Sequence, residues 1–512
     1  MAGEGTPAAH PGPAEPAVLL EVSQVPELPV PEPGHEARMY AVVTVTVRRP
    51  AVRAAPTDPA VRAVPSAPSA PTAPTDPAVP SAPTAPTAPA APTAPTAPTA
   101  PSARSAAVQG QGPRHAVVFL IDHSSSMVNP PTRMAAARNA AAAAVHAVPD
   151  GAYFAVVAGR DRPATVYPEQ PGGHRTLAVA DDVTRRAAED ALRACHPGGG
   201  TAIGSWLGRA RELFAGLPGG GADFVRHALL LTDGRNEPGY ESRDELAAVV
   251  ASCTGQFTCD AIGIGDGWDT GELLLITTGL NGTAHAFEET DPTGPLPARL
   301  HDLTRQAAER DLTGLRLRLY RSDNAELRSF AQVHPTRRTL RPVEETEFLR
   351  EFATEPWGDE TRSYLLSLSA RHTARAEGAE LMLTEVELVR DGAARPPVRL
   401  PPSRPVVVRW SGDHGLYSRV HPDVGHFLHQ EDLVRYFEEG CAALRAHDPG
   451  TARRALGRAW QLAVEVGDDA MREHLEKMVE PRADGEVELH ARIRRFDIET
   501  ARIRTSYTTS HR

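Results

Sequence analysis

Apolar runs of strand length alternate with helical stretches between residues 115 and 309, and this alternation constrains the fold more than any other feature. The stretch at 132–145 is built largely from alanine, the strongest helix former. Strands that alternate with helices predict an α/β domain, here 114–309, with a mostly parallel sheet and helices on both faces. Ligands of such sheets bind at the carboxyl ends of the strands. The expected strands are 115–122, 153–158, 226–233, 258–264 and 283–288.

A different pattern, in which apolar and polar residues alternate strictly, lies on both sides of this α/β segment. It predicts strands within 16–48 and again within 310–415. Because two strands cannot form a core of their own, we expect 16–48 to join the sheet of 310–415, a region of about the size of a β-sandwich. The α/β domain would then be inserted in a β-sandwich-like domain.

Residues 49–113 form a linker rich in Pro, Ala and Thr, and from Pro65 to Pro101 a proline falls at every third position. Polyproline II has three residues per turn, so this repeat predicts a semi-rigid spacer. The spacer is either inert or a docking site for proline-binding or threonine-modifying proteins. Residues 1–15, which precede the first strand, are expected to be disordered.

The last part of the chain is expected to be helical over 425–482, with small-residue spacing similar to a tetratricopeptide (TPR-like) helix hairpin. Residues 483–512 are polar and rich in Thr and Ser near their end. The Thr- and Ser-rich end, 505–510, is expected to be flexible.

Composition excludes several classes of function. The formal charge is −11 and no basic cluster is present, so we expect no nucleic-acid partner. A signal peptide and an apolar run of bilayer length are both lacking, which indicates a cytoplasmic protein without a membrane span. Cysteines are too few for a disulfide framework: Cys253 and Cys259 could pair, but buried reduced thiols are the favoured interpretation. The four cysteines are Cys195, Cys253, Cys259 and Cys441.

Oxygen-bearing side chains follow three segments of the α/β region. The first strand ends on an Asp, with a Ser two and four residues later, and the other oxygens follow a Gly-Gly-Gly run and the strand at 226–233. Carboxylate and hydroxyl oxygens suit Mg²⁺ or Mn²⁺. Helix capping alone would explain the first group, but not the other two. The predicted metal ligands are Asp122, Ser124, Ser126, Thr201 and Asp233.

These residues resemble the metal-ion-dependent adhesion site, or MIDAS, of von Willebrand factor A (VWA) domains, which are Rossmann-like. The longer text around Ser126, Gly204 and Glu237 looks like an actinobacterial group of cytosolic proteins with this domain. Position 125 is Ser where the family usually has Gly, and its cost depends on whether the loop needs φ > 0. His123, beside the site, is expected to face solvent.

The resemblance implies a protein-interaction module in which the bound cation takes an Asp or Glu carboxylate from a partner protein. It also implies a setting with Ser/Thr kinases, phosphatases and phosphothreonine-binding proteins, for which threonines of the linker and tail would be targets. We expect no enzymatic activity: a phosphohydrolase using Asp122 usually needs a second acid at 124, which is Ser. The remaining alternative is a metal-independent scaffold that acts through the linker and helical tail.

Overall fold

The computed structural model describes residues 15–32, 35–49, 113–169, 176–221, 223–288, 294–372, 379–391, 398–482 and 486–509. The expected disorder at 1–15 and the expected linker at 49–113 lie outside these ranges, apart from residues 15, 49 and 113. Within the described ranges, no helix combines the length and the apolar character needed to cross a bilayer.

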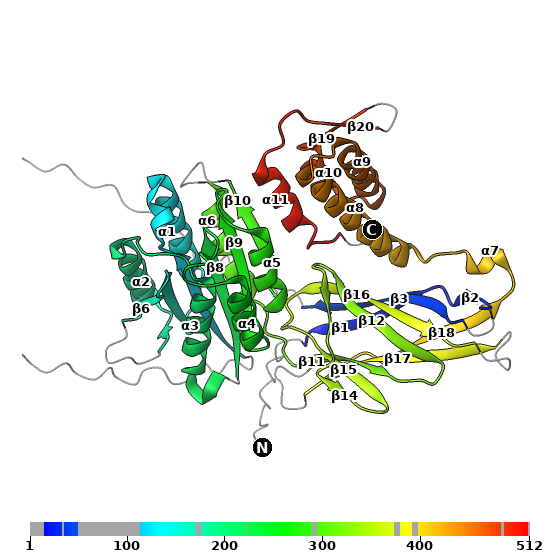
Figure 1. The fold of residues 1–512 in the computed structure, drawn as a ribbon. Helices are drawn as coiled ribbons and strands as arrows, with labels where there is room; N and C mark the ends of the chain where they lie inside the picture. Colours follow the sequence, from blue (N-terminus) through cyan, green and yellow to red (C-terminus); the bar gives the residue numbers. More distant parts are fainter. Residues whose placement is uncertain are drawn as a thin grey trace, which may run out of the picture. The chain divides into compact units, whose positions relative to one another are not determined.

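The α/β part is built on a sheet with the strand order β10-β9-β8-β4-β5-β6, and β7 also pairs with β5 (Figure 1). The pairs from β10 to β5 are parallel, whereas β6 and β7 run antiparallel to β5. The strands are β4 (Arg114–Asp122), β5 (Tyr153–Gly159), β6 (Ala164–Tyr167), β7 (Ala178–Val179), β8 (Phe224–Thr232), β9 (Thr258–Ile264) and β10 (Ala284–Phe287).

Helices cover both faces of this sheet. Alternate residues of β4 point to opposite faces, so Val118 packs in one core cluster and Phe119 in the other. The cluster of Val118 contains side chains of α3, α4 and α5, and that of Phe119 contains side chains of α1, α2 and α6. The helices are α1 (Pro131–His146), α2 (Asp182–Ala194), α3 (Ile203–Ala215), α4 (Arg243–Cys253), α5 (Thr270–Gly279) and α6 (Pro295–Ala308), with short 3₁₀ turns η1 (Ser125–Val128) and η3 (Pro218–Gly221). The predicted Rossmann-like α/β fold is therefore confirmed.

Two further sheets share one hydrophobic core and form the β-rich part. Their strand orders are β1-β3-β16-β12-β13 and β14-β15-β11-β17-β18-β2. β3 pairs with β16 over its whole length, so a strand that precedes the α/β part lies next to one that follows it. Such pairing is expected when the α/β part is inserted between strands of the β-rich part. The strands are β1 (Ala17–Gln24), β2 (Glu27–Pro29), β3 (Ala37–Arg48), β11 (Leu315–Tyr320), β12 (Ala325–His334), β13 (Arg338–Thr339), β14 (Glu344–Glu345), β15 (Leu349–Ala353), β16 (Glu360–Ala370), β17 (Glu380–Arg390) and β18 (Arg404–Ser411).

The C-terminal part is helical, as expected. Gly440 of α8 allows close packing on α9, because a Cβ there would lie 2.6 Å from Leu456 Cγ. Gly467 ends α9 in the left-handed conformation, with φ of 69°. The elements are α7 (His414–Tyr417), α8 (Pro422–Arg445), α9 (Pro449–Val466), α10 (Asp469–Glu476), β19 (Val479–Pro481), β20 (Val487–Leu489) and α11 (Arg495–Arg504).

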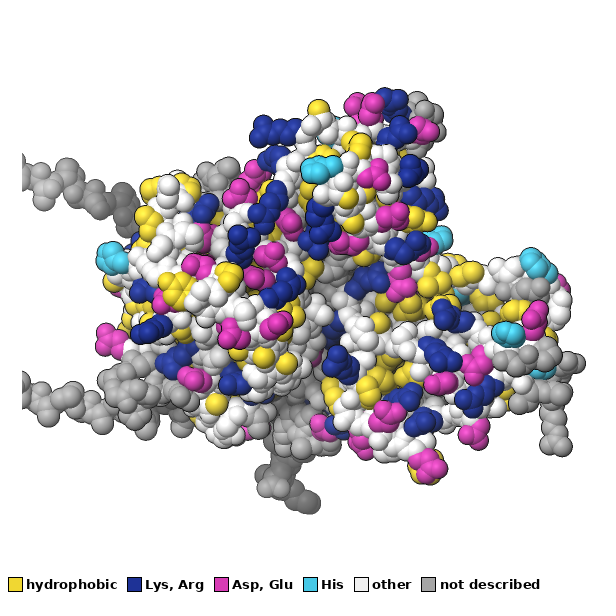
Figure 2. All heavy atoms as spheres, viewed as in Figure 1, with side chains coloured by type: hydrophobic (Ala, Val, Ile, Leu, Met, Phe, Trp, Pro, Cys, Tyr) yellow, Lys and Arg dark blue, Asp and Glu magenta, His cyan; other side chains and the backbone are white. Residues whose placement is uncertain are grey.

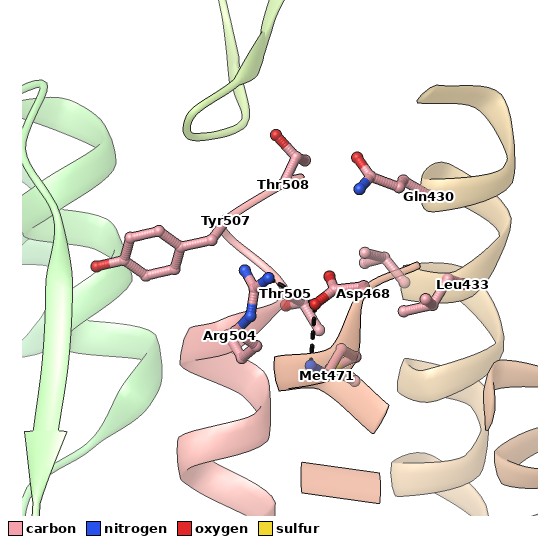
Figure 3. Close-up of a pocket in the computed structure, with 9 residues that line it drawn as sticks. Gln430, Leu433, Asp468, Met471, Arg504, Thr505, Tyr507 and Thr508 are labelled. Carbon is pink, nitrogen blue, oxygen red and sulfur yellow. Dashed lines mark hydrogen bonds and ion pairs between the residues drawn. The ribbon is translucent and has the colours of Figure 1, made fainter. Parts of the chain in front are cut away.

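The prediction of a flexible chain end at 505–510 is wrong for residues 505–509, which the structure describes. Ile503 of α11 belongs to a core cluster of the α/β part, and Ala501 belongs to that of the helical part. Beyond α11, the Tyr507 hydroxyl donates a 2.6 Å hydrogen bond to the Ala284 carbonyl of β10, and Thr508 N donates to the Pro335 carbonyl. Figure 3 shows Tyr507 pointing away from Asp468 and Met471, toward a strand. These few apolar and backbone contacts order a segment whose composition is polar.

Cys253, Cys259 and Cys441 are free and buried, and Cys195 is free and half-buried. Charged side chains of both signs are interspersed over the face drawn in Figure 2.

Candidate metal centre

The two aspartates of the predicted site lie at the carboxyl edge of the parallel sheet. Asp122 is the last residue of β4, and Asp233 directly follows β8. β4 and β8 are parallel neighbours in which Ile121 pairs with Leu231, so both strands end at the same level. Both aspartates are buried. Parallel pairing of two apolar strands therefore brings together two carboxylates that are far apart in the sequence.

Both carboxylate oxygens of Asp122 accept hydrogen bonds. Ser124 N donates to Oδ1 over 2.8 Å, and the Thr232 hydroxyl donates to Oδ2 over 2.6 Å. Burial, followed by the nearby charge of Asp233, raises the pKa of Asp122 to about 6. Two buried carboxylates at one point are costly unless a cation or hydrogen bonds compensate them.

A chain of oxygens links the two serines to the second aspartate. Ser124 Oγ lies 2.8 Å from Ser126 Oγ, and Ser126 Oγ donates to Asp233 Oδ1 over 2.7 Å. Mg²⁺–oxygen distances of about 2.1 Å place neighbouring ligands of an octahedron about 3.0 Å apart. The observed spacings are close to that value, so the oxygens fit a small hard cation.

Thr201 reaches the same place from the loop before α3. The Cα of Gly234, directly after Asp233, faces both hydroxyls: a Cβ there would lie 3.6 Å from Thr201 Oγ1 and 3.8 Å from Ser126 Oγ. Thr201 itself is buried. The structure thus gathers all five predicted donors at one edge of the sheet, and their assignment as metal ligands stays a prediction.

Ser125, the departure from the family's usual Gly, supports the loop that carries Thr201. Its amide and its hydroxyl both donate to the Gly199 carbonyl, over 3.0 and 2.9 Å. Among the described non-glycine residues, positive φ occurs only at Asn281 and His447, so Ser125 carries no left-handed strain. The substitution therefore adds a hydrogen bond between the two loops of the site.

The expectation that His123 faces solvent is wrong. Its side chain is fully buried, with Nδ1 2.9 Å from the Ile121 carbonyl. Burial lowers the pKa of His123 to about 4, so the ring is neutral at pH 7. The backbone of His123 is held as well, because its amide donates to the Gly159 carbonyl at the end of β5 over 2.9 Å. His123 is therefore an interior residue next to Asp122.

Sequence reasoning missed Arg133, on the first turn of α1. Its Nη1 donates to Asp233 Oδ2 over 2.6 Å, and the two side chains are 16% and 0% exposed. No motif marks this residue, because its position depends on how α1 leaves the loop after Ser126. Reasoning also missed Thr232, although it stands directly before Asp233 at the end of a buried strand.

Grouped His, Cys, Asp and Glu side chains do not form any other metal site: among the described residues, no three of them are arranged to hold an ion. The site at Asp122 and Asp233 is of another kind, because three of its five predicted donors are hydroxyls. Only two of the five predicted donors are therefore negatively charged. Such a site suits a cation that keeps some of its water ligands and can exchange one of them for a ligand from another molecule.

Comparison with known proteins identifies the α/β part. Residues 115–286 match the family model described as "von Willebrand factor type A domain". A solved structure named von Willebrand factor type A, from Catenulispora acidiphila, is 27% identical, with a TM-score of 0.76, and the match covers 98% of this chain and 99% of that one. The ArnB paralog VWA2 from Sulfolobus acidocaldarius is 13% identical, with a TM-score of 0.50, and covers 96% and 98% of the two chains, which shows likeness of fold alone. No curated protein matches. The chain thus contains a VWA domain, a typical protein-interaction module, and the match to the Catenulispora protein extends beyond this domain into the β-rich and helical parts.

Proposed function

We propose that the VWA domain binds a partner protein through a divalent cation, Mg²⁺ or Mn²⁺, held by the side chains of Asp122, Ser124, Ser126, Thr201 and Asp233. The observation that carries the proposal is the hydroxyl–hydroxyl–carboxylate chain from Ser124 to Asp233, whose spacings suit an octahedral cation. A cation held there supplies an open coordination position for a carboxylate oxygen of an Asp or Glu on the partner.

The surroundings of the site favour a protein over a small anion as the partner. Val128, two residues after Ser126, is 52% exposed, and Tyr240 is 56% exposed. The Tyr240 ring lies against the loop of Thr201, because a Cβ on Gly200 would fall 2.1 Å from its Cε2. Exposed apolar and tyrosine side chains are typical of the residues that anchor protein interfaces. The rim would pack on the partner around the carboxylate.

We further propose that the site is not catalytic. Both oxygens of Asp122 are held by hydrogen bonds, so its carboxylate is poorly placed to attack a phosphoryl group. The acid that a phosphohydrolase usually carries two residues later is replaced by Ser124.

Calorimetric titration with MgCl₂ and MnCl₂ tests the proposal. We expect about one cation per chain in the wild type, and loss of binding in Asp122→Ala and Ser126→Ala. Ser252→Ala, which removes a hydroxyl from α4, is the matched control and should bind as the wild type does. Bound Mn²⁺ enhances the relaxation rate of water protons. This enhancement should fall when acetate is added, because a carboxylate oxygen replaces a water molecule on the cation. Equal binding by all four proteins would contradict the proposal, and would favour a scaffold that works without metal.

The cellular setting proposed from the resemblance is cytoplasmic signalling with a Ser/Thr kinase or a phosphothreonine-binding protein. The tail offers restricted access to a kinase, because Thr508 is buried and its hydroxyl donates to the Val333 carbonyl. Thr509 Oγ1 likewise accepts from Gln430 Nε2 over 2.7 Å. Modification of these threonines would require the segment to detach first. Mass spectrometry after co-expression with a kinase tests the setting, which would be contradicted if linker and tail threonines both stayed unmodified.

A further inference from the structure

The chain itself places a positive charge at the metal centre. The Arg133 guanidinium donates to Asp233 Oδ2 over 2.6 Å, while Ser126 occupies Oδ1. Both carboxylate oxygens of Asp233 therefore accept a hydrogen bond, one from a hydroxyl group and one from the guanidinium group. The other aspartate differs, since the donors to Asp122 are uncharged: the Ser124 amide and the hydroxyls of Ser124 and Thr232.

The place of Arg133 in the fold makes this contact a built feature of the site. Arg133 stands near the start of α1, and its amide donates to the Pro130 carbonyl over 3.0 Å. Its side chain is only 16% exposed and that of Asp233 is fully covered, so solvent screens the pair weakly. The Coulomb attraction within such a shielded pair is screened less than the attraction within a pair on the surface.

This inference rests on the proposed function, in which the site binds a divalent cation and then a carboxylate. Formal charges show how Arg133 affects the binding of each. Asp122 and Asp233 contribute −2, so a bound divalent cation would bring the donor set to zero. Arg133 adds +1 beside Asp233, so the occupied site is one unit more positive than it would be without this side chain. Positive charge disfavours a cation and favours an anion at the same place.

We propose that Arg133 sets the selectivity of the site, weakening its grip on the divalent cation and strengthening its capture of the partner's carboxylate. Without the cation, Arg133 neutralises Asp233. With the cation bound, the positive charge of the guanidinium makes the centre more attractive to an incoming carboxylate. Arg133 is thus a positioning residue and not one of the metal's ligands.

The test compares wild type, Arg133→Gln and Arg133→Lys in two titrations, one with Mn²⁺ alone and one with acetate added to the Mn²⁺-loaded protein. In Arg133→Gln we expect Mn²⁺ to bind at least tenfold tighter and acetate at least tenfold weaker. Arg133→Lys keeps the charge and should stay within about threefold of wild type for both ligands. Arg193→Gln breaks the exposed ion pair of Arg193 with Glu189 on α2 and matches the change in net charge. It should alter neither affinity.

The outcomes separate this inference from the function on which it rests. If neither wild type nor Arg133→Gln binds Mn²⁺, the metal site itself is refuted. If both bind Mn²⁺ and acetate with equal affinities, the metal site stands and the role of Arg133 is refuted. A structural effect alone would weaken both ligands together, so the opposite signs of the two changes are the diagnostic result.

Discussion

The Thr232 hydroxyl donates a 2.6 Å hydrogen bond to Oδ2 of Asp122, and this bond joins the ends of β8 and β4. Both partners are fully buried. The bond fixes the carboxylate in the orientation in which Oδ1 accepts from Ser124 N. Thr232 therefore supports the metal centre although it is not one of the predicted ligands.

Replacing Thr232 by Val should weaken both the fold and the site. Val keeps the shape and removes the hydroxyl, so a buried carboxylate oxygen loses its donor, at a cost of about 1.5–3 kcal/mol in the free energy of unfolding. Urea unfolding measures this loss, and the Mn²⁺ affinity should fall as well. Thr232→Ser restores the hydroxyl and should recover most of both. Wild-type stability in Thr232→Val would show that the bond does not hold Asp122.

Gly267 should be required for the position of Asp233. A Cβ at Gly267 would lie 2.5 Å from the Asp233 carbonyl oxygen, so an alanine there must push the backbone aside. We expect Gly267→Ala to lower Mn²⁺ affinity about tenfold and to cost about 1–3 kcal/mol of stability. Gly239→Ala is the matched control, because no atom lies within 4 Å of its Cβ position. Equal metal affinities in the two variants would contradict this role.

The architecture of the α/β part follows from the sequence, because the central strands β4, β5 and β8 each contain an uninterrupted apolar run and helical stretches separate them. The five oxygen donors follow in the same way, since parallel strands place their ends at one edge. The contact of Arg133 with Asp233 and the ordered end of the chain cannot be predicted in this way. The Arg133–Asp233 pair depends on the path of the chain between Ser126 and α1, and the order of 495–509 depends on a few contacts such as Tyr507 with Ala284. Neither leaves a periodic signal.

Tyr507→Phe should loosen the end of the chain. The variant loses the hydrogen bond from the hydroxyl to the Ala284 carbonyl, which is worth about 1 kcal/mol. Amide hydrogen exchange over 505–509 should accelerate, while exchange in β4 and β8 should be unchanged. Tyr240→Phe, at an exposed tyrosine of another loop, should leave tail exchange as in wild type. Unaltered exchange in Tyr507→Phe would mean that other contacts alone hold the tail.

The stability of the protein should fall with acid partly through His285. Burial, with a further contribution from Arg299, lowers the pKa of this imidazole to about 4, against the opposing effect of Asp260. Tyr507 OH, Thr283 Oγ1 and Arg299 Nη2 all contact the ring. Between pH 6.5 and 4 the unfolded chain binds a proton that the folded protein does not, so the free energy of unfolding decreases as pH falls through this window.

The magnitude of the His285 effect is up to roughly 1.4 kcal/mol per pH unit. Urea unfolding at a series of pH values from 7 to 4 measures it. His285→Gln cannot take up the proton in either state, so its profile should be flatter than that of wild type by this amount. Parallel profiles for the two proteins would contradict the assignment and leave the acid sensitivity to other groups, such as His123, whose pKa is also about 4.

Anomalous diffraction from crystals grown with MnCl₂ tests for the metal site itself, because it locates the cation without reference to any partner. We expect one anomalous peak per chain, surrounded by the side-chain oxygens of Asp122, Ser124, Ser126, Thr201 and Asp233, either directly or through water. A map without a peak at this edge of the sheet, from protein saturated with Mn²⁺, would contradict this expectation.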